Sequence, residues 1–210
     1  MASFLDLRNQ IASDLTRDDL SSQIASAVSD AIAHYETDRF YFNVTRSLTF
    51  PTVVGQSAYT GNDLAQIPNI IRIDHLFLRD TVSTYELDRY EPDEFEWLQG
   101  NNTGPGKPSC FTYVDGQILL WPVPITVYTM RPHMHYRLAP LVSDTDTNAW
   151  CNGIAGQLIR SHAKLLLYTN LIEDTDGMQR MQLQIPAFKA KLDYETSART
   201  ATGQIRGTDF

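Results

Sequence analysis

The sequence predicts an α+β protein, in which a helical bundle carries an inserted small antiparallel β-domain and an extended C-terminal arm. Three observations predict this fold class. Apolar residues follow the 3.6-residue period of a helix in residues 1–39 and again in residues 147–196. Residues 40–146 instead contain short β-prone runs separated by Gly and Pro. Residues 197–210 are polar, contain glycine and show no period, so we expect an arm there.

Residues 1–39 predict a pair of N-terminal helices. The first is short, ends near Thr16, and has an apolar face made of Leu5, Leu7, Ile11 and Leu15. Asp18 and Asp19 precede the second helix, where their negative charges interact favourably with the positive end of the helix dipole. Its stripe, with the spacing of one helix face, comprises Leu20, Ile24, Ala27, Val28, Ala31, Ile32 and Tyr35. Each helix therefore has one stripe to bury.

Residues 40–146 predict five or six short antiparallel strands. Asp115-Gly116 favours a tight hairpin turn, because glycine accepts the positive φ of a type I′ turn. Residues 91–98 predict one short helix with Pro92 in its first turn. The runs assigned to strands are YFNVTRSLTFP from Tyr41, IPNIIRIDHLFLRD from Ile67, SCFTYV from Ser109, QILLWPVP from Gln117 and ITVYTMRPHMHYRL from Ile125.

Residues 147–196 predict two long C-terminal helices. The first is capped at Asp146 or Thr147 and runs to about Leu171. Its apolar face consists of Ile154, Leu158, Leu165 and Leu166. The second covers residues 175–196, and its stripe consists of Met178, Met181, Ile185, Phe188 and Leu192. Pro186 removes one hydrogen-bond donor inside this helix, so we expect a kink or a break there.

The composition excludes several functional classes. Lys and Arg number 17 against 25 Asp and Glu, a formal net charge of −8, which disfavours tight binding to a phosphate backbone and permits a surface past which DNA slides. Cys110 and Cys151 fit no metal or redox spacing and are expected to be buried thiols. The N-terminus lacks a signal-peptide pattern and no apolar run is long enough to span a membrane, so we expect a soluble protein made in a reducing cytoplasm.

Three candidate ligand sites are weak. His133 and His135 share a face of a predicted strand, but no third ligand stands at a suitable spacing for a metal. The run Asp144, Asp146 and Asn148 resembles the start of an EF-hand loop, yet the glycine and the closing glutamate of that loop are absent, which favours helix capping. Residues 104–108, GPGKP, lack the spacing of a phosphate-binding loop. We therefore expect no metal and no cofactor.

A glycan hydrolase is one alternative function that the sequence leaves open. Carboxylates near Glu91 could supply a general acid and a general base. Glycosidase carboxylates need apolar shielding to separate their pKa values, and nothing in the sequence indicates such a pocket. A solvated acidic face is the more ordinary interpretation, and we predict that the protein is not an enzyme. The carboxylates concerned are Glu86, Asp88, Glu91, Asp93, Glu94 and Glu96.

The aromatic residues are expected to be core or interface residues. Tyr and Trp are favoured at protein interfaces, so a subset should face neighbouring subunits. The sequence does not select this subset from Tyr85, Tyr90, Trp97, Trp121, Tyr128, Tyr136 and Trp150.

In this order of elements the chain resembles the head-to-tail adaptor, or connector, proteins of tailed bacteriophages, as found in short-tailed podophages and related to tail tubular proteins. The resemblance covers nearly the whole chain as a sequence of motifs. One departure is Cys151-Asn152-Gly153, where the family more often has apolar residues; with Gly156 it weakens the first turn of the long helix. The matching segments are the helix pair closing on Tyr35 and Phe40, the strands of residues 67–78 and 118–124, Tyr136-Arg137-Leu138, the acidic turn into Asn148-Ala149-Trp150, and residues 163–168.

The resemblance implies a structural virion protein of the phage neck. About twelve copies would form a ring, a dodecamer, beneath the portal, join the capsid to the tail, and continue the DNA channel used in genome ejection. Its partners would be the portal protein, tail or nozzle proteins and further copies of itself, with DNA only as passing cargo and no membrane. The alternative within this class is a tail-tube or tail-completion subunit.

The resemblance also implies roles for particular residues. The arm of residues 197–210 would dock onto the portal, with contacts from Arg199, Ile205, Arg206 and Phe210. The aromatic residues expected to serve the structure or its interfaces are Tyr35, Trp121, Tyr136, Trp150 and Tyr168.

Overall fold

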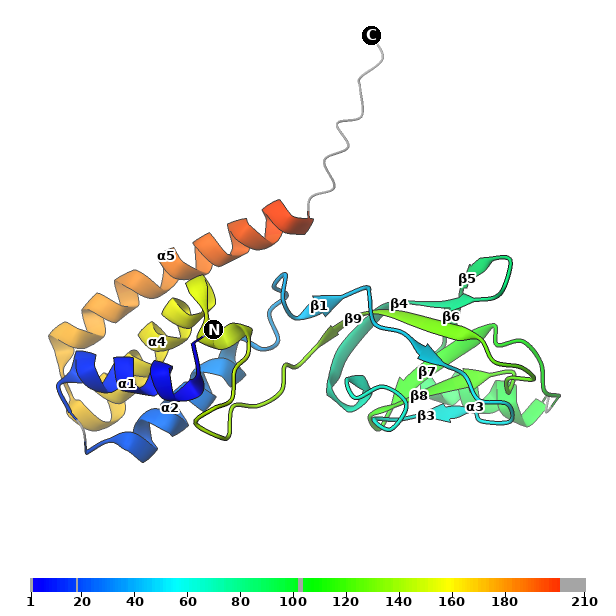
Figure 1. Cartoon of the computed structure of the whole chain (residues 1–210), viewed down its shortest axis with the longest axis horizontal. Helices are drawn as coiled ribbons and strands as arrows, with labels where there is room; N and C mark the ends of the chain where they lie inside the picture. The colour runs from blue at the N-terminus through cyan, green and yellow to red at the C-terminus, as the bar shows by residue number, and fades with distance from the viewer. Residues whose placement is uncertain (1, 18, 102–103, 201–210) are drawn as a thin grey trace, which may run out of the picture. The chain divides into compact units, whose positions relative to one another are not determined.

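The computed structural model describes residues 2–17, 19–101 and 104–200, which form two compact units (Figure 1). The helical unit comprises the chain up to Phe42 and from Leu138 onward, and the β unit comprises Asn43–Arg137. The chain passes between the units twice, so the β unit is an insertion in the helical unit. Ile205, Arg206 and Phe210, which we expect to contact the portal, lie outside the described residues.

Helix α1, Phe4–Leu15, begins at a capping box. The Asp6 amide donates to Ser3 Oγ at 3.1 Å, and the Ser3 amide donates to the Asp6 carboxylate at 2.8 Å, which satisfies two amides at the helix start. The predicted end is confirmed, since Thr16 adopts a left-handed conformation with φ of 51°. Leu5 was wrongly placed in the buried stripe. It is 39% exposed and Phe4 takes its place, because the helix buries Phe4 in phase with Leu7 and Ile11.

Helix α2, Ser21–Tyr35, confirms the predicted stripe. Six of its seven members are buried and Ile32 is partly buried against the same core. On its other face the helix carries small polar residues such as Ser22, Ser26 and Ser29. The helix therefore packs through one face only.

The predicted cap of the next helical segment was wrong. Asn148 is the N-cap, and its side chain accepts the Trp150 amide at 2.9 Å at the start of the short 3-10 helix η2, Ala149–Cys151. Asp146 is unavailable for that role, because it accepts the Val142 and Ser143 amides at 2.8 and 2.7 Å. Helix α4, Gly153–Leu167, follows, and a π-helical segment η3, Tyr168–Ile172, continues the chain.

The buried face of α4 differs from the predicted one. Of the four predicted residues only Leu158 is fully buried; Ile154, Leu165 and Leu166 are partly exposed. Helix α4 packs against α2 and α5. Its small residues allow a close approach of the helix backbones, so the face that contains the alanines is the buried one. The fully buried apolar residues of α4 are Ala155, Leu158, Ile159, Ala163 and Leu167.

Helix α5, Thr175–Thr200, confirms the predicted inner stripe, whose members are its least exposed apolar residues. We expected a kink or a break at Pro186; the helix runs through Pro186 without interruption, so the break does not occur. Pro186 lies on the exposed side, where water can bond the carbonyl that lost its donor. The helix also continues to Thr200, so residues 197–200 are helical rather than extended as we expected.

The β unit contains a five-stranded and a four-stranded sheet among the described residues, more strands than the five or six predicted. The first has the order β1-β9-β4-β5 with β2 also on β9, and the second has the order β3-β8-β7-β6. One pair, β6–β7, is parallel and corrects the all-antiparallel expectation. The strands are β1 Val44–Thr45, β2 Phe50–Pro51, β3 Ala58–Tyr59, β4 Ile70–Arg79, β5 Thr84–Glu86, β6 Asp88–Arg89, β7 Cys110–Val114, β8 Gln117–Trp121 and β9 Thr129–Tyr136.

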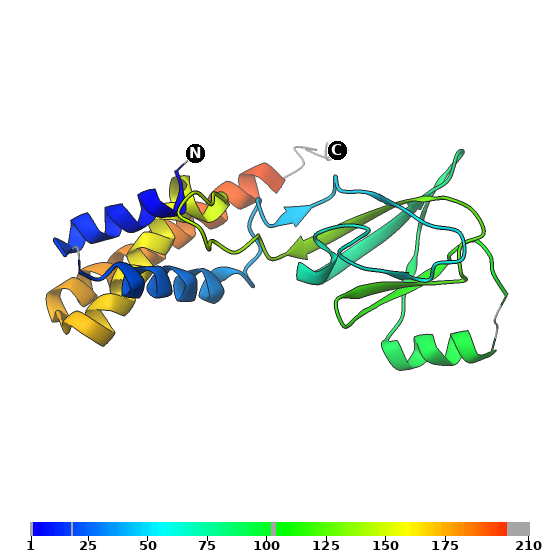
Figure 2. The same cartoon turned by 60° about the horizontal axis from the view of Figure 1, so that its bottom comes forward.

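The predicted hairpin turn and short helix of the β unit are confirmed. Asp115 and Gly116, with φ of 51° and 69°, join β7 to β8 as a type I′ turn requires. Helix α3, Pro92–Asn101, is the one α-helix of the β unit in Figure 2 among the described residues, and it contacts β7. Its Phe95 is buried. A 3-10 turn, η1, Ile67–Asn69, precedes β4. Phe111, Ile118 and Leu120 belong to the separate apolar core of this unit.

Candidate assembly surfaces

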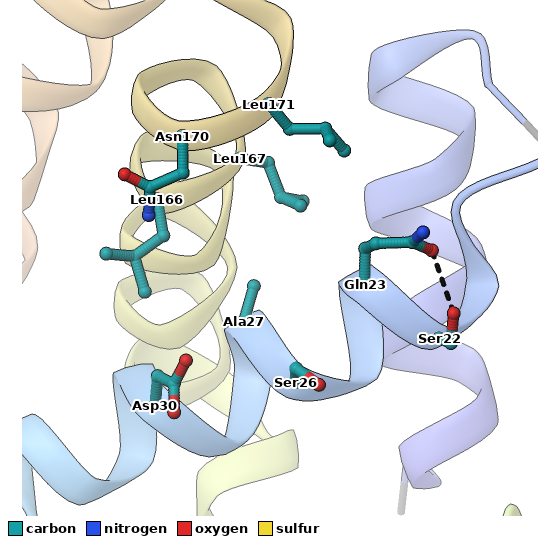
Figure 3. Close-up of a pocket in the computed structure, with 9 residues that line it drawn as sticks. All are labelled: Ser22, Gln23, Ser26, Ala27, Asp30, Leu166, Leu167, Asn170 and Leu171. Atoms are coloured by element: carbon teal, nitrogen blue, oxygen red, sulfur yellow. Dashed lines mark hydrogen bonds between the residues drawn. The ribbon is translucent and has the colours of Figure 1, made fainter.

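An open groove lies in the helical unit between α2 and the end of α4 with η3 (Figure 3). Leu166, Leu167 and Leu171 give it an apolar wall, and Leu171 remains 47% exposed. The groove has a volume of about 310 Å³ and only one charged lining residue, Asp30. Such a surface suits apolar side chains of a partner better than catalysis. Its nine lining residues are Ser22, Gln23, Ser26, Ala27, Asp30, Leu166, Leu167, Asn170 and Leu171.

The second half of α5 is attached to the segment that follows α2. Lys189 donates to Asp38 at 2.6 Å, and its ammonium lies 5.5 Å from the centre of the Phe40 ring. The Arg199 guanidinium lies 4.0 Å from the centre of the Tyr41 ring. These ion-pair and cation–π contacts stabilise the position of α5, which packs on the helical unit through a narrow apolar stripe. Arg199, expected in a docking arm, is thus in contact with its own helical unit.

Two of the aromatic residues expected to serve the structure or its interfaces lie in the core of the helical unit. Trp150 is 1% exposed and packs edge-to-face on Phe42, with ring centres 4.8 Å apart. Tyr35 is 3% exposed, and its hydroxyl lies 2.9 Å from Nδ1 of His162. Burial, followed by the neighbouring His34, lowers the pKa of His162, which favours its neutral form in the fold. These side chains stabilise the unit from inside.

The remaining expected aromatics, Trp121, Tyr136 and Tyr168, are partly buried. Larger aromatic exposure occurs at Trp97, 70% exposed, and Tyr194, 76% exposed. Tyr194 is not among the aromatic residues predicted from the sequence to face a neighbour. The helical period could have identified it, because that period places Tyr194 on the face of α5 opposite the inner stripe.

An exposed apolar patch lies at one end of the β unit, where two non-strand segments run together. The Thr52 amide donates to the Tyr128 carbonyl at 2.8 Å, and the Gly55 amide donates to the Pro124 carbonyl at 3.0 Å. We expected a strand from Ile125, but β9 begins only at Thr129. The patch, called here the β-end patch, consists of Val53, Val54, Ile125 and Val127, with exposed fractions of 47%, 59%, 55% and 63%.

The acidic cluster considered for glycan hydrolysis lies in solvent. Glu91, Asp93, Glu94 and Glu96 are all exposed. Asp93 and Glu94 line an open surface hollow beside Tyr90, Trp97 and Leu98, where water reaches both carboxylates, whereas glycosidase carboxylates need apolar shielding to separate their pKa values. Glu86 lies 2.5 Å from Nδ1 of His75 on the neighbouring strand, at a site that is half exposed. This arrangement is that of a solvated acidic face.

The candidate metal positions are also engaged in other contacts. Among the described residues, no group of three or more His, Cys, Asp or Glu side chains could hold a metal ion. Asp144 pairs with Arg8 at 2.5 Å, while Asp146 accepts backbone amides of its own turn.

Cys110 and Cys151 are free and buried, which confirms the expectation of buried thiols. Burial lowers the pKa of His133, with further lowering from Arg46 and Arg131.

Comparison with known protein families gives a match. A family model described as SU10 adaptor protein matches residues 2–207, which spans both units. The comparison with curated proteins found no match. Within the part of the chain that the structure describes, no helix is both long and apolar enough to cross a membrane.

Proposed function

Since this chain belongs to the SU10 adaptor protein family, a family of phage head-to-tail adaptors, we propose that it forms a ring beneath the portal, joins the capsid to the tail and continues the DNA channel. About twelve copies would complete such a ring. The observation that carries the proposal is the family match over residues 2–207. The role is structural, and the protein would reside in the neck of the virion.

Two properties of the chain support this role. The exposed apolar surfaces lie on both units, in the groove of the helical unit and in the β-end patch, as expected for a subunit with several partners. The net charge of −8 disfavours adhesion to DNA, which must pass through the channel without being held.

The test mixes the purified chain with purified portal of the same phage and examines the particles by electron microscopy. A ring of this chain stacked on the portal is the expected result. Binding to a tail ring but not to the portal would instead identify a tail-tube or tail-completion subunit. A zymogram on host cell-wall glycan that shows clearing would favour the hydrolase.

The C-terminal arm is proposed to latch the portal. Because residues 197–200 belong to α5 and Arg199 contacts Tyr41, the informative truncation removes residues 201–210, including Ile205, Arg206 and Phe210, and leaves α5 intact. We expect the truncated chain to have the same unfolding temperature as the full chain. It should, however, lose binding to the portal. Portal affinity equal to that of the full chain would refute the latch.

The β-end patch is proposed as the contact for a tail protein. Val54→Asp and Ile125→Asp each place a charge on this surface at a side chain that is more than half exposed. The variants should still join the portal and should lose attachment of the tail. Normal tail attachment would remove this assignment and leave the adaptor role in place.

A further inference from the structure

Helix α5 carries two apolar stripes on opposite faces. The inner stripe packs into the helical unit, whereas Leu183 and Tyr194 are 79% and 76% exposed. Ala187 and Ala190 lie between them and are also exposed. These four residues recur at offsets of 4, 3 and 4, the spacing of a single helix face. A surface helix without a partner normally carries polar residues on that face, so this outer stripe indicates a missing partner.

The groove between α2 and α4 has mostly short side chains along its α2 edge. Ser22, Ser26 and Asp30 follow one face of α2 at intervals of four, and Figure 3 places them along the edge of the groove with Ala27 facing the leucines. Small side chains let a second helix approach to an axis separation of about 8 Å. The α2 edge is about 12 Å long and the outer stripe about 16 Å, at 1.5 Å per residue.

The charges beside the two surfaces are opposite. Asp30 lies at the groove, and Lys191 lies on α5 next to Ala190. Both are exposed, and across residues 2–17, 19–101 and 104–200 neither makes an ion pair. The ammonium of Lys191 has a ring contact, 5.7 Å from the centre of Phe188. A second copy of the chain would bring a carboxylate and an ammonium together at this contact.

We propose that the outer stripe of α5 in one copy packs into the α2–α4 groove of the next copy. The two surfaces are different, since the lining of the groove comes from α2, α4 and η3. Their pairing is therefore head-to-tail and propagates from copy to copy until a ring closes. This inference rests on the proposed adaptor function and identifies the subunit contact of its ring.

Disulfide trapping tests the contact directly. Ser26→Cys and Ala190→Cys are made in separate full-length chains, mixed, assembled alone or on purified portal, and treated with a mild oxidant. Covalent dimers that contain one copy of each variant are expected. Gln182→Cys, an exposed position on a different face of α5, is the matched control and should not link to Ser26→Cys. The native Cys110 and Cys151 are buried and should not react.

Charge reversal supplies an independent readout. Asp30→Lys or Lys191→Asp alone should raise the concentration required for half-assembly by about tenfold, as expected for the loss of a close interfacial charge pair. The double variant should recover most of the loss. Both positions are exposed, so unchanged thermal unfolding of each variant separates assembly from folding.

The outcomes distinguish the contact from the function. Rings that form normally, with no Ser26–Ala190 link and no effect of charge reversal, would overturn the proposed contact and leave the adaptor role intact. A wild-type chain that never associates with itself, with or without portal, would overturn both. Links between two copies of Ala190→Cys would show a symmetric contact of α5 with itself and also overturn the proposal.

Discussion

Leu183 and Leu192 lie on opposite faces of one helix: Leu192 is fully buried in the helical unit and Leu183 is 79% exposed. They stand about two and a half turns apart in α5, since a turn contains about 3.6 residues. The same helix thus stabilises its own unit with one face and presents an apolar stripe with the other.

This difference predicts different costs of truncation. Leu192→Ala should lower the free energy of unfolding by about 2–4 kcal/mol, because it removes a buried side chain and leaves a cavity. Leu183→Ala should change it by less than about 0.5 kcal/mol in the monomer. Urea unfolding followed by circular dichroism at a concentration below assembly measures both. Equal losses in the two variants would contradict the opposite placement.

Asp14 connects α1 to α4 and should stabilise the helical unit near neutral pH. Its carboxylate accepts Arg160 Nε at 2.7 Å and Lys164 Nζ at 2.8 Å. Burial acts to raise the pKa of Asp14, but the hydrogen bonds from Arg160 and Lys164 outweigh it, and the pKa lies below its ordinary value of 3.8. Asp14→Asn should therefore cost about 1 kcal/mol at pH 7.

The same lowered pKa gives the sign of the pH dependence. The contribution of Asp14 is present above pH 3.8 and is lost as the pH falls through the folded-state pKa. The difference in unfolding free energy between wild type and Asp14→Asn should shrink below pH 4. A difference that stays constant down to pH 3 would show that the loss is one of packing.

His162 predicts loss of stability on mild acidification. Its pKa is lowered from 6.5 by burial and by His34, so the unfolded chain binds a proton at a higher pH than the folded chain. The folded chain also places the Tyr35 hydroxyl against this ring, with Lys189 near the Tyr35 ring. The free energy of unfolding should fall as the pH drops below 6.5. In His162→Gln this fall should be smaller, as measured by urea titrations at pH 7.5 and 5.5.

Replacement of Gly156 by alanine should lower the stability of the fold, although alanine normally stabilises a helix relative to glycine. A Cβ at this position would meet the Cys151 carbonyl oxygen at 2.8 Å, so the backbone of η2 or α4 must shift. Gly156→Ala should therefore destabilise by about 1–3 kcal/mol, as overpacking does. Gly100 in α3 is the matched control, since its Cβ would meet nothing within 4 Å. Gly100→Ala should stabilise by about 0.5–1 kcal/mol, and a thermal melt compares the two.

Arg199 and Tyr41 should together hold the last turns of α5. Arg199→Ala removes a cation from above the Tyr41 ring, which should cost about 0.5–1 kcal/mol of local stability. Amide hydrogen exchange in residues 194–200 should accelerate. Tyr41→Leu should have a similar effect, and the double variant should add little. Additive effects would indicate that the two side chains act separately.

The sequence predicted the elements whose pattern is local and long. The stripe of α2 and the inner stripe of α5 were found because several helical turns repeat the same spacing. The strands β3, β5 and β6 contain only two or three residues, too few for a period, and their existence depends on partners distant in the chain.

The features that the sequence analysis predicted wrongly or missed depend largely on contacts between residues that the local pattern does not reveal. Asp146, Thr147 and Asn148 are all good helix caps, and the choice of Asn148 depends on the engagement of Asp146 by Val142 and Ser143. The helical extension to Thr200 coincides with a long-range contact, because the Tyr41 amide donates to Thr196 across 155 positions. The outer stripe of α5 went unnoticed since its middle residues are alanines, which suit both buried and exposed faces.

The β unit begins and ends at neighbouring backbone positions, since the Tyr136 amide donates to the Asn43 carbonyl at 3.0 Å and Val44 pairs with His135. The helical unit therefore has only a short gap to bridge at this insertion point. A lineage can lengthen, exchange or delete the insertion by altering two adjacent junctions, without changing the order of the helices. The two units are therefore free to diverge at different rates.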